Sequence, residues 1–230
     1  MAEPVVIGID FGGSKIATGV CECDGTLLGT ASVDTRPGDG GPANLMSGLQ
    51  AARELASRVA PRRPVAAVGA CTFGIPGELG IALAPAIPGW AGLALEEELR
   101  RSFPGAEVRV ATDVKAAAQV EADSGALAGH DPGIYVNLGS GLAVAVVASG
   151  KVLQGRHGAA GEVAYNLRTV RDVGVPAHAR TNLEDAVSGR ALTRAMSVSD
   201  DGAPSQPDTA DPRFGESLRV SVTELAFHLV

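Results

Sequence analysis

The chain has 230 residues, 45% of them hydrophobic, which is enough for one large domain or two modest ones around a buried core. A net charge of −7 and an aromatic content of 3% leave it without the basic clusters and stacking rings of nucleic-acid binders, so we expect no nucleic-acid partner. It contains neither a run of about 18 apolar residues nor a signal-peptide pattern before the first strand, so we expect a cytoplasmic protein that does not enter membranes.

The first half of the chain predicts elements in the order strand, strand, strand, helix, strand, helix, strand. β-Branched runs bounded by Gly and Pro indicate the strands, and apolar residues three and four apart indicate the long helix. A turn at Asp24 and Gly25 joins the second strand to the third, so the first three strands should form an antiparallel meander. The expected ranges are 5–10, 15–24, 26–31, 42–58, 65–73, 93–102 and 108–111.

The second half repeats the pattern of strand, glycine turn, strand, turn and strand, which predicts two related α/β lobes, 1–112 and 113–230. Its strands are expected at 134–138, 142–148 and 152–153, its helices at 114–127, 183–196 and 214–230, and a Ser- and Pro-rich loop at 198–212. The last helical pattern is still apolar and uncapped at Val230, so we expect the second lobe to be cut short.

Two glycine turns that follow strands are candidate phosphate sites. The first turn contains Asp10, Gly12, Gly13, Ser14 and Lys15, and the second contains Gly139, Ser140 and Gly141. Glycine amides can approach a phosphate closely, and a carboxylate beside them can hold Mg²⁺. The first turn has the spacing of neither a Walker A loop nor a GxGxxG motif. Two such turns facing each other would hold both ends of a triphosphate, whereas plain hairpin turns remain the alternative.

Asp113 is the candidate catalytic residue. It follows the strand expected at 108–111, and α/β folds bind ligands at the carboxyl ends of such strands. A carboxylate there can accept the proton of an alcohol during phosphoryl transfer. The alternative is that Asp113 only caps the helix expected at 114–127.

Six segments, in order, resemble motifs of the repressor, open reading frame and kinase (ROK) family, and together they cover the chain from Val5 to about Leu192. They are a first phosphate motif at 6–15, a sugar loop at 73–77 with 85–90, a catalytic segment at 112–118, a second phosphate motif at 138–141, a sugar segment at 155–162, and the segment at 183–189 that follows the family's zinc site.

The resemblance implies a ribonuclease H-like, actin-like ATPase fold with two lobes around a cleft. It also implies a glucokinase-like kinase that transfers phosphate from ATP to the 6-hydroxyl of a hexose or N-acetylhexosamine. Asp113 would be the base, Asp10 would hold Mg²⁺, and the two glycine turns would bind the ATP phosphates. The sugar would contact Gly77, Thr112, Glu162 and Tyr165. Family members are commonly dimers, so a homodimer is also allowed.

Several positions depart from the family pattern. Thr112 stands where the family usually has a sugar-binding Asn, and Leu142 follows the second turn where further glycines are common. Tyr165 replaces the zinc-binding His and no cysteine follows Cys71, so we predict no structural zinc. Lys115 replaces another Asn, and it is either a cation near Asp113 or a solvated helix residue.

Two further questions stay open from the sequence. Trp90 could pack on a sugar or anchor the sugar loop against its lobe. The rival to a kinase is a non-catalytic sugar sensor or pseudokinase, and a third possibility is a fragment of a complete kinase, since the family's adenosine-binding segment would lie beyond Val230.

Overall fold

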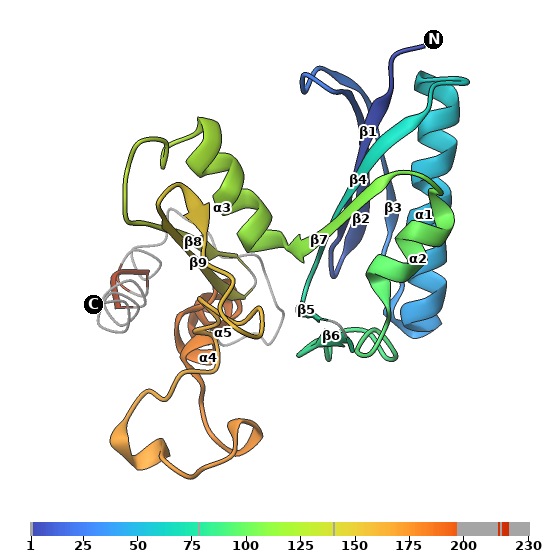
Figure 1. The fold of residues 1–230 in the computed structure, drawn as a ribbon. Coiled ribbons are helices and arrows are strands. Elements are labelled where there is room, and N and C mark those ends of the chain that lie inside the picture. The colour runs from blue at the N-terminus through green and yellow to red at the C-terminus, as the bar shows by residue number, and fades with distance from the viewer. Residues whose placement is uncertain (1, 78, 140, 197–215, 217, 221–230) are drawn as a thin grey trace. The chain divides into compact units, whose positions relative to one another are not determined.

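The computed structural model describes residues 2–77, 79–139, 141–196, 216 and 218–220 (Figure 1). The chain divides into two compact units. Unit 1 comprises Met1–Ala117 and Gln154–Ala159, and unit 2 comprises Ala118–Leu153 and Ala160–Val230. The lobes expected from the sequence, 1–112 and 113–230, are a separate division of the chain and remain a prediction.

Unit 1 is built on a five-stranded sheet in which β1, β4 and β7 are parallel and β2 is antiparallel to both of its neighbours. In spatial order the strands are β3 (Leu27–Asp34), β2 (Lys15–Glu22), β1 (Val5–Phe11), β4 (Val65–Thr72) and β7 (Glu107–Thr112). A ribbon of β5 (Ile75–Gly77) and β6 (Gly80–Ala82) follows β4. The predicted antiparallel meander of the first three strands is therefore confirmed.

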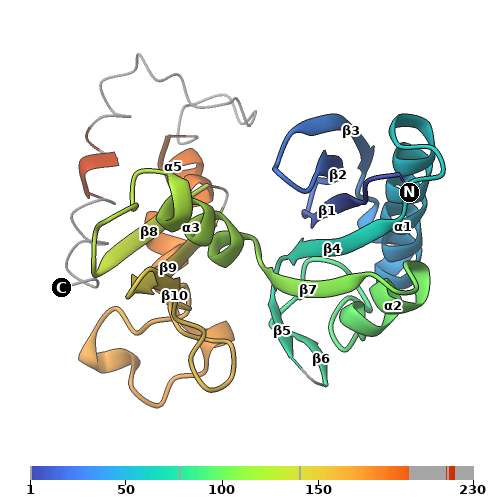
Figure 2. The same cartoon turned by 45° about the horizontal axis from the view of Figure 1, so that its top comes forward.

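The core of unit 1 lies between this sheet and two helices on one of its faces, α1 (Gly40–Val59) and α2 (Leu95–Ser102) (Figures 1 and 2). Strand alternation turns Ile7 and Ile9 into the core, where Leu49 and Leu99 are also buried. Each such side chain contributes about 1.5–3 kcal/mol when it leaves water. Asp10 belongs to the other set of β1 residues and faces away from these helices.

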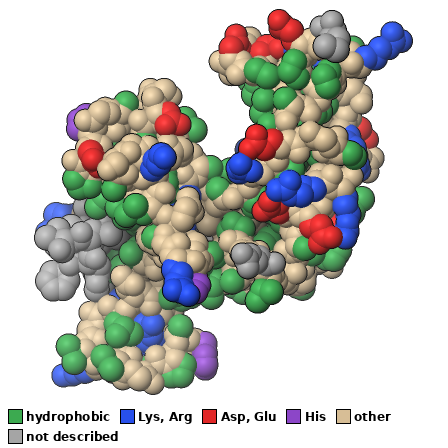
Figure 3. Space-filling view, viewed as in Figure 1, with side chains coloured by type: hydrophobic (Ala, Val, Ile, Leu, Met, Phe, Trp, Pro, Cys, Tyr) green, Lys and Arg blue, Asp and Glu red, His purple; other side chains and the backbone are tan. Residues whose placement is uncertain are grey.

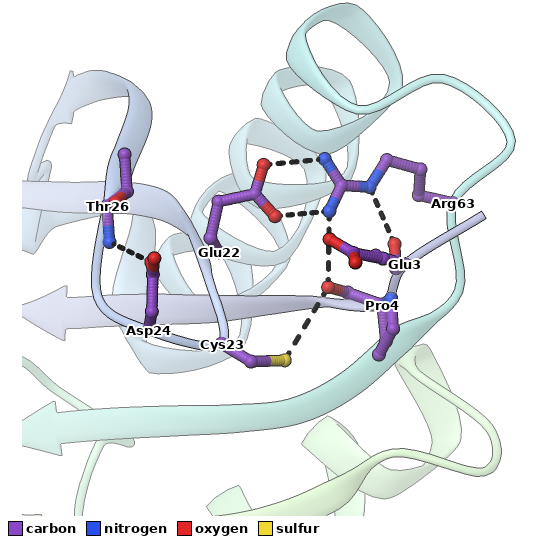
Figure 4. Close-up of polar contacts among 7 residues, drawn as sticks. All are labelled: Glu3, Pro4, Glu22, Cys23, Asp24, Thr26 and Arg63. Atoms are coloured by element: carbon purple, nitrogen blue, oxygen red, sulfur yellow. Dashed lines mark hydrogen bonds and ion pairs between the residues drawn. The ribbon is translucent and has the colours of Figure 1, made fainter.

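A polar cluster stabilises the end of the unit 1 sheet at which β1 begins (Figure 4). Arg63 donates from Nη1 to Glu22 Oε1 at 2.9 Å and from Nη2 to the other carboxylate oxygen, and its Nε donates to the Glu3 carbonyl at 2.6 Å. This hydrogen bonding by Arg63 holds the pKa of Glu22 below its ordinary value. The cluster joins the residues before β1 to the end of β2 and to the turn before β4.

Unit 2 contains a smaller sheet with the strand order β10 (Lys151–Val152), β9 (Leu142–Ala148), β8 (Gly133–Leu138). α3 (Asp113–Ser124) begins in unit 1 and ends in unit 2. The short helices α4 (Leu183–Val187) and α5 (Gly189–Met196) come later. The buried residues Leu183 and Val187 of α4 pack with Leu142 and Val144 of β9, so α4 covers the start of that strand.

The structure corrects one expected helix, and most of another lies outside the described residues. The single helix predicted at 183–196 is wrong, because Ser188 has an extended ψ of 165° and separates α4 from α5. The Gly189 amide after this break donates to the Gly139 carbonyl at 2.8 Å, a tertiary bond that apolar periodicity cannot reveal. The loop predicted at 198–212 and most of the helix predicted at 214–230 lie outside the described residues.

Opposite charges interleave on the surface of α2. Arg100 pairs with Glu96 at 2.6 Å, and Arg101 pairs with Glu97 and Glu98. Acidic and basic side chains accordingly lie next to each other on this face of unit 1 (Figure 3). Within the part of the chain that the structure describes, no helix has the length and apolar character to cross a membrane.

Candidate active site

The site in unit 1 begins with carboxylates at the carboxyl ends of parallel strands. Strand register places Asp10 of β1 beside Cys71 of β4, and Cys71 beside Ala111 of β7. All three line a cavity of about 540 Å³ on the sheet face away from α1 and α2. Asp113 starts α3 immediately after β7. The predicted catalytic Asp113 and the predicted metal ligand Asp10 therefore lie at the same end of one sheet, at strands that β4 separates.

Charge and burial act together on these groups. Burial raises the pKa of Asp10, the negative charge of Asp113 raises it further, and Lys15 lowers it. Burial, Asp10 and Asp113 together raise the pKa of the Cys71 thiol to about 11. The two carboxylates are thus close enough to repel each other, and Cys71 stays a protonated thiol near neutral pH.

An Asp113→Asn chain should have a lower Asp10 pKa, because the neighbouring negative charge is gone. A carboxyl whose pKa is higher in the folded state than in the unfolded state stabilises the fold most at low pH. This stabilisation is lost as the pH rises from the unfolded-state pKa to the folded-state pKa. The substitution should therefore make the stability of the chain fall less over this pH range. The carboxyl ¹³C shift of Asp10, followed against pH, measures the change.

Asp24 is the control for this titration. The hydrogen bond from the Thr26 amide lowers the pKa of Asp24, and Asp113 is not among the causes of this shift. An Asp10 midpoint that stays the same or rises in the Asp113→Asn chain would show that the two carboxylates do not interact.

The first glycine turn is closed by its own hydrogen bonds. The Gly12 amide donates to the Lys15 carbonyl at 3.0 Å, and a Cβ at Gly12 would lie 2.8 Å from that carbonyl oxygen, so only glycine fits. Thr35 reaches the turn from the end of β3, where its hydroxyl donates to the Gly12 carbonyl at 2.7 Å and its amide donates to the Ser14 carbonyl at 3.1 Å. The Gly12 amide is therefore engaged within the turn and is not available to a ligand.

Thr35 was missed by the sequence reasoning. Its bond to Gly12 joins residues 23 positions apart, and no local pattern marks it.

Trp90 anchors the sugar loop. Its side chain is fully buried, and its ring stacks on Phe73 at 5.2 Å between centroids and lies tilted against Phe11 at 5.4 Å. The indole N–H donates to the buried Thr72 hydroxyl at 2.9 Å, and that hydroxyl donates to the Phe73 carbonyl. Of the two roles left open by the sequence, the structure therefore favours the anchor.

The next residues of the sugar loop border a second, smaller space. Gly77 ends β5 and lines a cavity of about 200 Å³ together with Ile81, Leu93 and Glu96. A Cβ at Gly77 would meet only the Gly80 carbonyl, at 3.6 Å, so the backbone here tolerates a side chain.

Thr112, rather than Asp113, caps α3. The Thr112 side chain is 5% exposed, and its hydroxyl accepts the Lys115 amide at 3.3 Å. Asp113 uses Oδ1 to accept only the adjacent Val114 amide, at 2.8 Å. The alternative role of Asp113 as the helix cap is therefore disfavoured, and the one hydroxyl of Thr112 already has a structural partner.

Lys115 is buried and holds a distant loop. It is only 2% exposed, and its ammonium donates to the Gly158 carbonyl. Gly158 has φ +72°, and a Cβ there would lie 3.1 Å from the Ile75 side chain. The segment Gln154–Ala159 therefore packs between α3 and β5 as part of unit 1. The reading of Lys115 as a solvated residue is wrong.

A Lys115→Met chain should show faster amide hydrogen exchange at residues 155–159. Methionine fills similar space but leaves the Gly158 carbonyl without this donor. Exchange in α1 should not change. Lys151→Met, at an exposed lysine of β10, is the matched control. Equal protection of 155–159 in the Lys115→Met chain and the parent chain would contradict this role.

In unit 2 the second glycine turn is held at both ends. Leu142 donates its amide to Glu184 Oε2 at 2.8 Å, and Gly139 accepts the Gly189 amide at 2.8 Å. A Cβ at Gly141 would lie 2.5 Å from Glu184 Oε2. Ser140, the remaining predicted residue of this turn, lies outside the described residues.

The other predicted sugar residues, Glu162 and Tyr165, also belong to unit 2. Glu162 is half-buried and Tyr165 is 42% exposed. Burial raises the pKa of Tyr165, and the nearby charges of Glu184, Asp185 and Glu162 raise it further. These acidic groups therefore lie near the Tyr165 ring.

The loop after Tyr165 is held by hydrogen bonds from its own residues. Arg180 donates to the carbonyls of Tyr165 and Asn166, and Asn182 donates to the Ala177 carbonyl at 2.9 Å. Among the described residues, no group of three or more His, Cys, Asp or Glu side chains could hold a metal ion.

Comparison with known proteins gives consistent matches. The ROK family model matches residues 6–217. A glucokinase from Streptomyces coelicolor is 31% identical over 191 residues, which are 83% of this chain and 58% of that protein. The chain thus spans about half the length of the curated relatives it matches.

Solved structures agree with this match. A ROK hexokinase from Thermus thermophilus has a TM-score of 0.74 at 28% identity, covering 98% of this chain and 76% of that one. A ROK family glucokinase from Streptomyces griseus, in complex with glucose and AMPPNP, has a TM-score of 0.71 at 27% identity, covering 96% of this chain and 79% of that one. The predicted actin-like ATPase fold is confirmed.

Proposed function

Since this chain belongs to the ROK family, we propose that it is a sugar kinase that transfers the terminal phosphate of ATP to the 6-hydroxyl of a hexose or N-acetylhexosamine. The observation that supports this most is that Asp10 and Asp113 lie at the same end of one sheet, by the carboxyl ends of β1 and β7, and that their charges interact. The glucokinase relatives and the bound glucose and AMPPNP of the Streptomyces griseus enzyme support the choice of substrates. A cytoplasmic location, where ATP is available, fits this role.

In the proposed mechanism, Asp113 accepts the proton of the attacking sugar hydroxyl. Its Oδ2 is available for this, because Oδ1 is the atom that accepts the Val114 amide. Gly77, Thr112, Glu162 and Tyr165 would orient the sugar so that the hydroxyl meets the phosphate in line. The later amides of the first turn, at Gly13 to Lys15, and those of the second turn would bind the ATP phosphates.

The residues present fit a magnesium ion at Asp10. Two repelling carboxylates with hard oxygen donors favour a small divalent cation, and phosphate oxygens would complete its ligands. Bound there, Mg²⁺ would neutralise charge on the transferring phosphate.

The test is ATP-dependent phosphorylation of a panel of hexoses and N-acetylhexosamines by this chain. Product that depends on both ATP and sugar supports the kinase and identifies its substrate. A folded chain that binds sugar but makes no product would favour the non-catalytic sensor instead. Calorimetric titration with each sugar provides the binding measurement.

A further inference from the structure

We propose that Arg180 is a positioning residue for the sugar, because its side chain holds the backbone of Tyr165 in place. This inference rests on the proposed kinase function, in which Tyr165 contacts the sugar. It gives a role to the loop at residues 166–181, where the sequence departs from the family's zinc pattern.

The loop at residues 166–181 is not held by apolar packing. None of its residues is buried, and Val170 and Val173 are 89% and 66% exposed. The loop extends away from the small sheet of unit 2 (Figure 1). A segment with few buried apolar contacts opens at little cost in free energy, so hydrogen bonds have to fix its two ends.

Arg180 joins the end of this loop to its beginning. Its Nη2 donates to the Tyr165 carbonyl at 2.7 Å, and its Nη1 donates to the Asn166 carbonyl at 3.1 Å. Because the guanidinium is planar and rigid, these two bonds fix two successive peptide groups relative to each other. Hydrogen bonds from a charged donor are also about twice as strong as those between neutral groups.

The residue before Tyr165 is held by the same returning segment. The Ala164 carbonyl accepts the Glu184 amide at 2.9 Å, and Ala164 is buried. Three successive carbonyls, those of residues 164–166, are therefore engaged by residues 180 and 184. A chain without the Arg180 guanidinium would keep only the first of these three bonds.

Arg180 also acts on the middle of the loop. The amides of Thr169 and Arg168 donate to Asp172 Oδ2 at 2.7 and 3.1 Å. The Thr169 amide is the main cause that holds the pKa of Asp172 below its ordinary value, and the positive charge of Arg180 adds to this effect. The guanidinium is therefore close enough to attract the carboxylate that orders residues 168–172.

The position of Tyr165 matters because its ring lies near the other predicted sugar residue of unit 2. Burial raises the pKa of Tyr165, and the charges of Glu184, Asp185 and Glu162 raise it further. Tyr165 is 42% exposed, so part of its ring is open to a ligand. A displaced backbone would move the ring relative to Glu162, and a sugar that contacts both side chains would lose one of them.

The experiment titrates glucose, N-acetylglucosamine and MgATP into the parent chain and its variants by calorimetry, and a coupled assay gives kcat and KM. Arg180→Met keeps the length of the side chain and removes both donors. It should weaken sugar binding and raise the sugar KM by about tenfold, as expected for a lost hydrogen bond to a charged group. MgATP affinity should not change, and kcat should change less than KM.

Two further variants serve as rescue and control. Arg180→Lys keeps a charged donor but not the planar fork, so it should bind sugar more tightly than Arg180→Met and less tightly than the parent chain. Arg171→Met, at an exposed arginine of the same loop, should bind sugar as the parent chain does. Circular dichroism checks that each variant is folded. Hydrogen exchange at residues 166–181 should be faster in Arg180→Met than in Arg171→Met.

A double-mutant cycle separates positioning from direct contact with the sugar. If Arg180 acts through Tyr165, adding Arg180→Met to a Tyr165→Ala chain should change sugar affinity by less than about twofold. An arginine that touched the sugar itself would show its full effect in both backgrounds.

The two proposals fail in different ways. A parent chain that binds neither sugar nor MgATP and makes no product overturns the kinase proposal and this inference with it. If the parent chain binds sugar and a folded Arg180→Met chain binds it equally well, only the positioning role is overturned. An undiminished effect of Arg180→Met in the Tyr165→Ala chain would overturn that role as well.

Discussion

An Asp113→Asn chain should phosphorylate sugar about 10²- to 10⁴-fold more slowly than the parent chain, the range expected for loss of a general base. Asparagine cannot accept the hydroxyl proton at the pH of the assay. It does keep an oxygen for the Val114 amide, and Thr112 still caps α3, so the fold should survive. A coupled assay gives kcat and KM, and thermal unfolding checks the fold.

Asp123→Asn is the matched control for this substitution. Asp123 lies on the same helix and is exposed, and its substitution likewise replaces a carboxylate with an amide. Its kcat should stay at the parent level. Turnover by Asp113→Asn within about twofold of the parent would assign proton removal to another group.

Trp90→Ala should lower the free energy of unfolding by about 3–5 kcal/mol, as large-to-small changes of buried aromatic residues do. The substitution removes a fully buried ring, its contacts with Phe11 and Phe73, and the donor to Thr72. Urea unfolding followed by circular dichroism measures the loss. Because these partners belong to β1, to β4 and to the sugar loop, the substitution should destabilise the sheet and the loop together.

Trp90→Phe separates packing from hydrogen bonding, because it keeps a ring and loses the indole N–H. It should cost less than Trp90→Ala. Leu27→Ala, at a side chain 60% exposed, should change stability by no more than about 0.5 kcal/mol. A Trp90→Ala chain as stable as the Leu27→Ala chain would contradict the anchoring role.

Local patterns in the sequence predicted most of unit 1. The meander of β1 to β3 follows from residue alternation and the Asp-Gly turn, and these signals act within a few residues. Asp10 and Asp113 could be placed at strand ends for the same reason. The identification of the family rested on six motifs in order, and the match over residues 6–217 confirms it.

Tertiary bonds account for what the sequence reasoning missed. The break between α4 and α5 depends on the Gly189 amide meeting Gly139, 50 residues earlier in the chain. A solvated helix residue was one of two alternatives for Lys115, because a lysine in a helix is usually exposed. Its burial depends on the Gly158 carbonyl, which lies 43 residues later.

The return of Gln154–Ala159 to unit 1 means that the chain passes between the two units at three points along its sequence, after Ala117, Leu153 and Ala159. A cut at any one of these points therefore leaves a fragment that contains residues of both units. A gene fragment that ends at Ala117 would also encode an incomplete unit 1, since the Lys115 ammonium would lose the Gly158 carbonyl as an acceptor. Unit 1 is thus not a module that can be excised as one contiguous stretch of sequence.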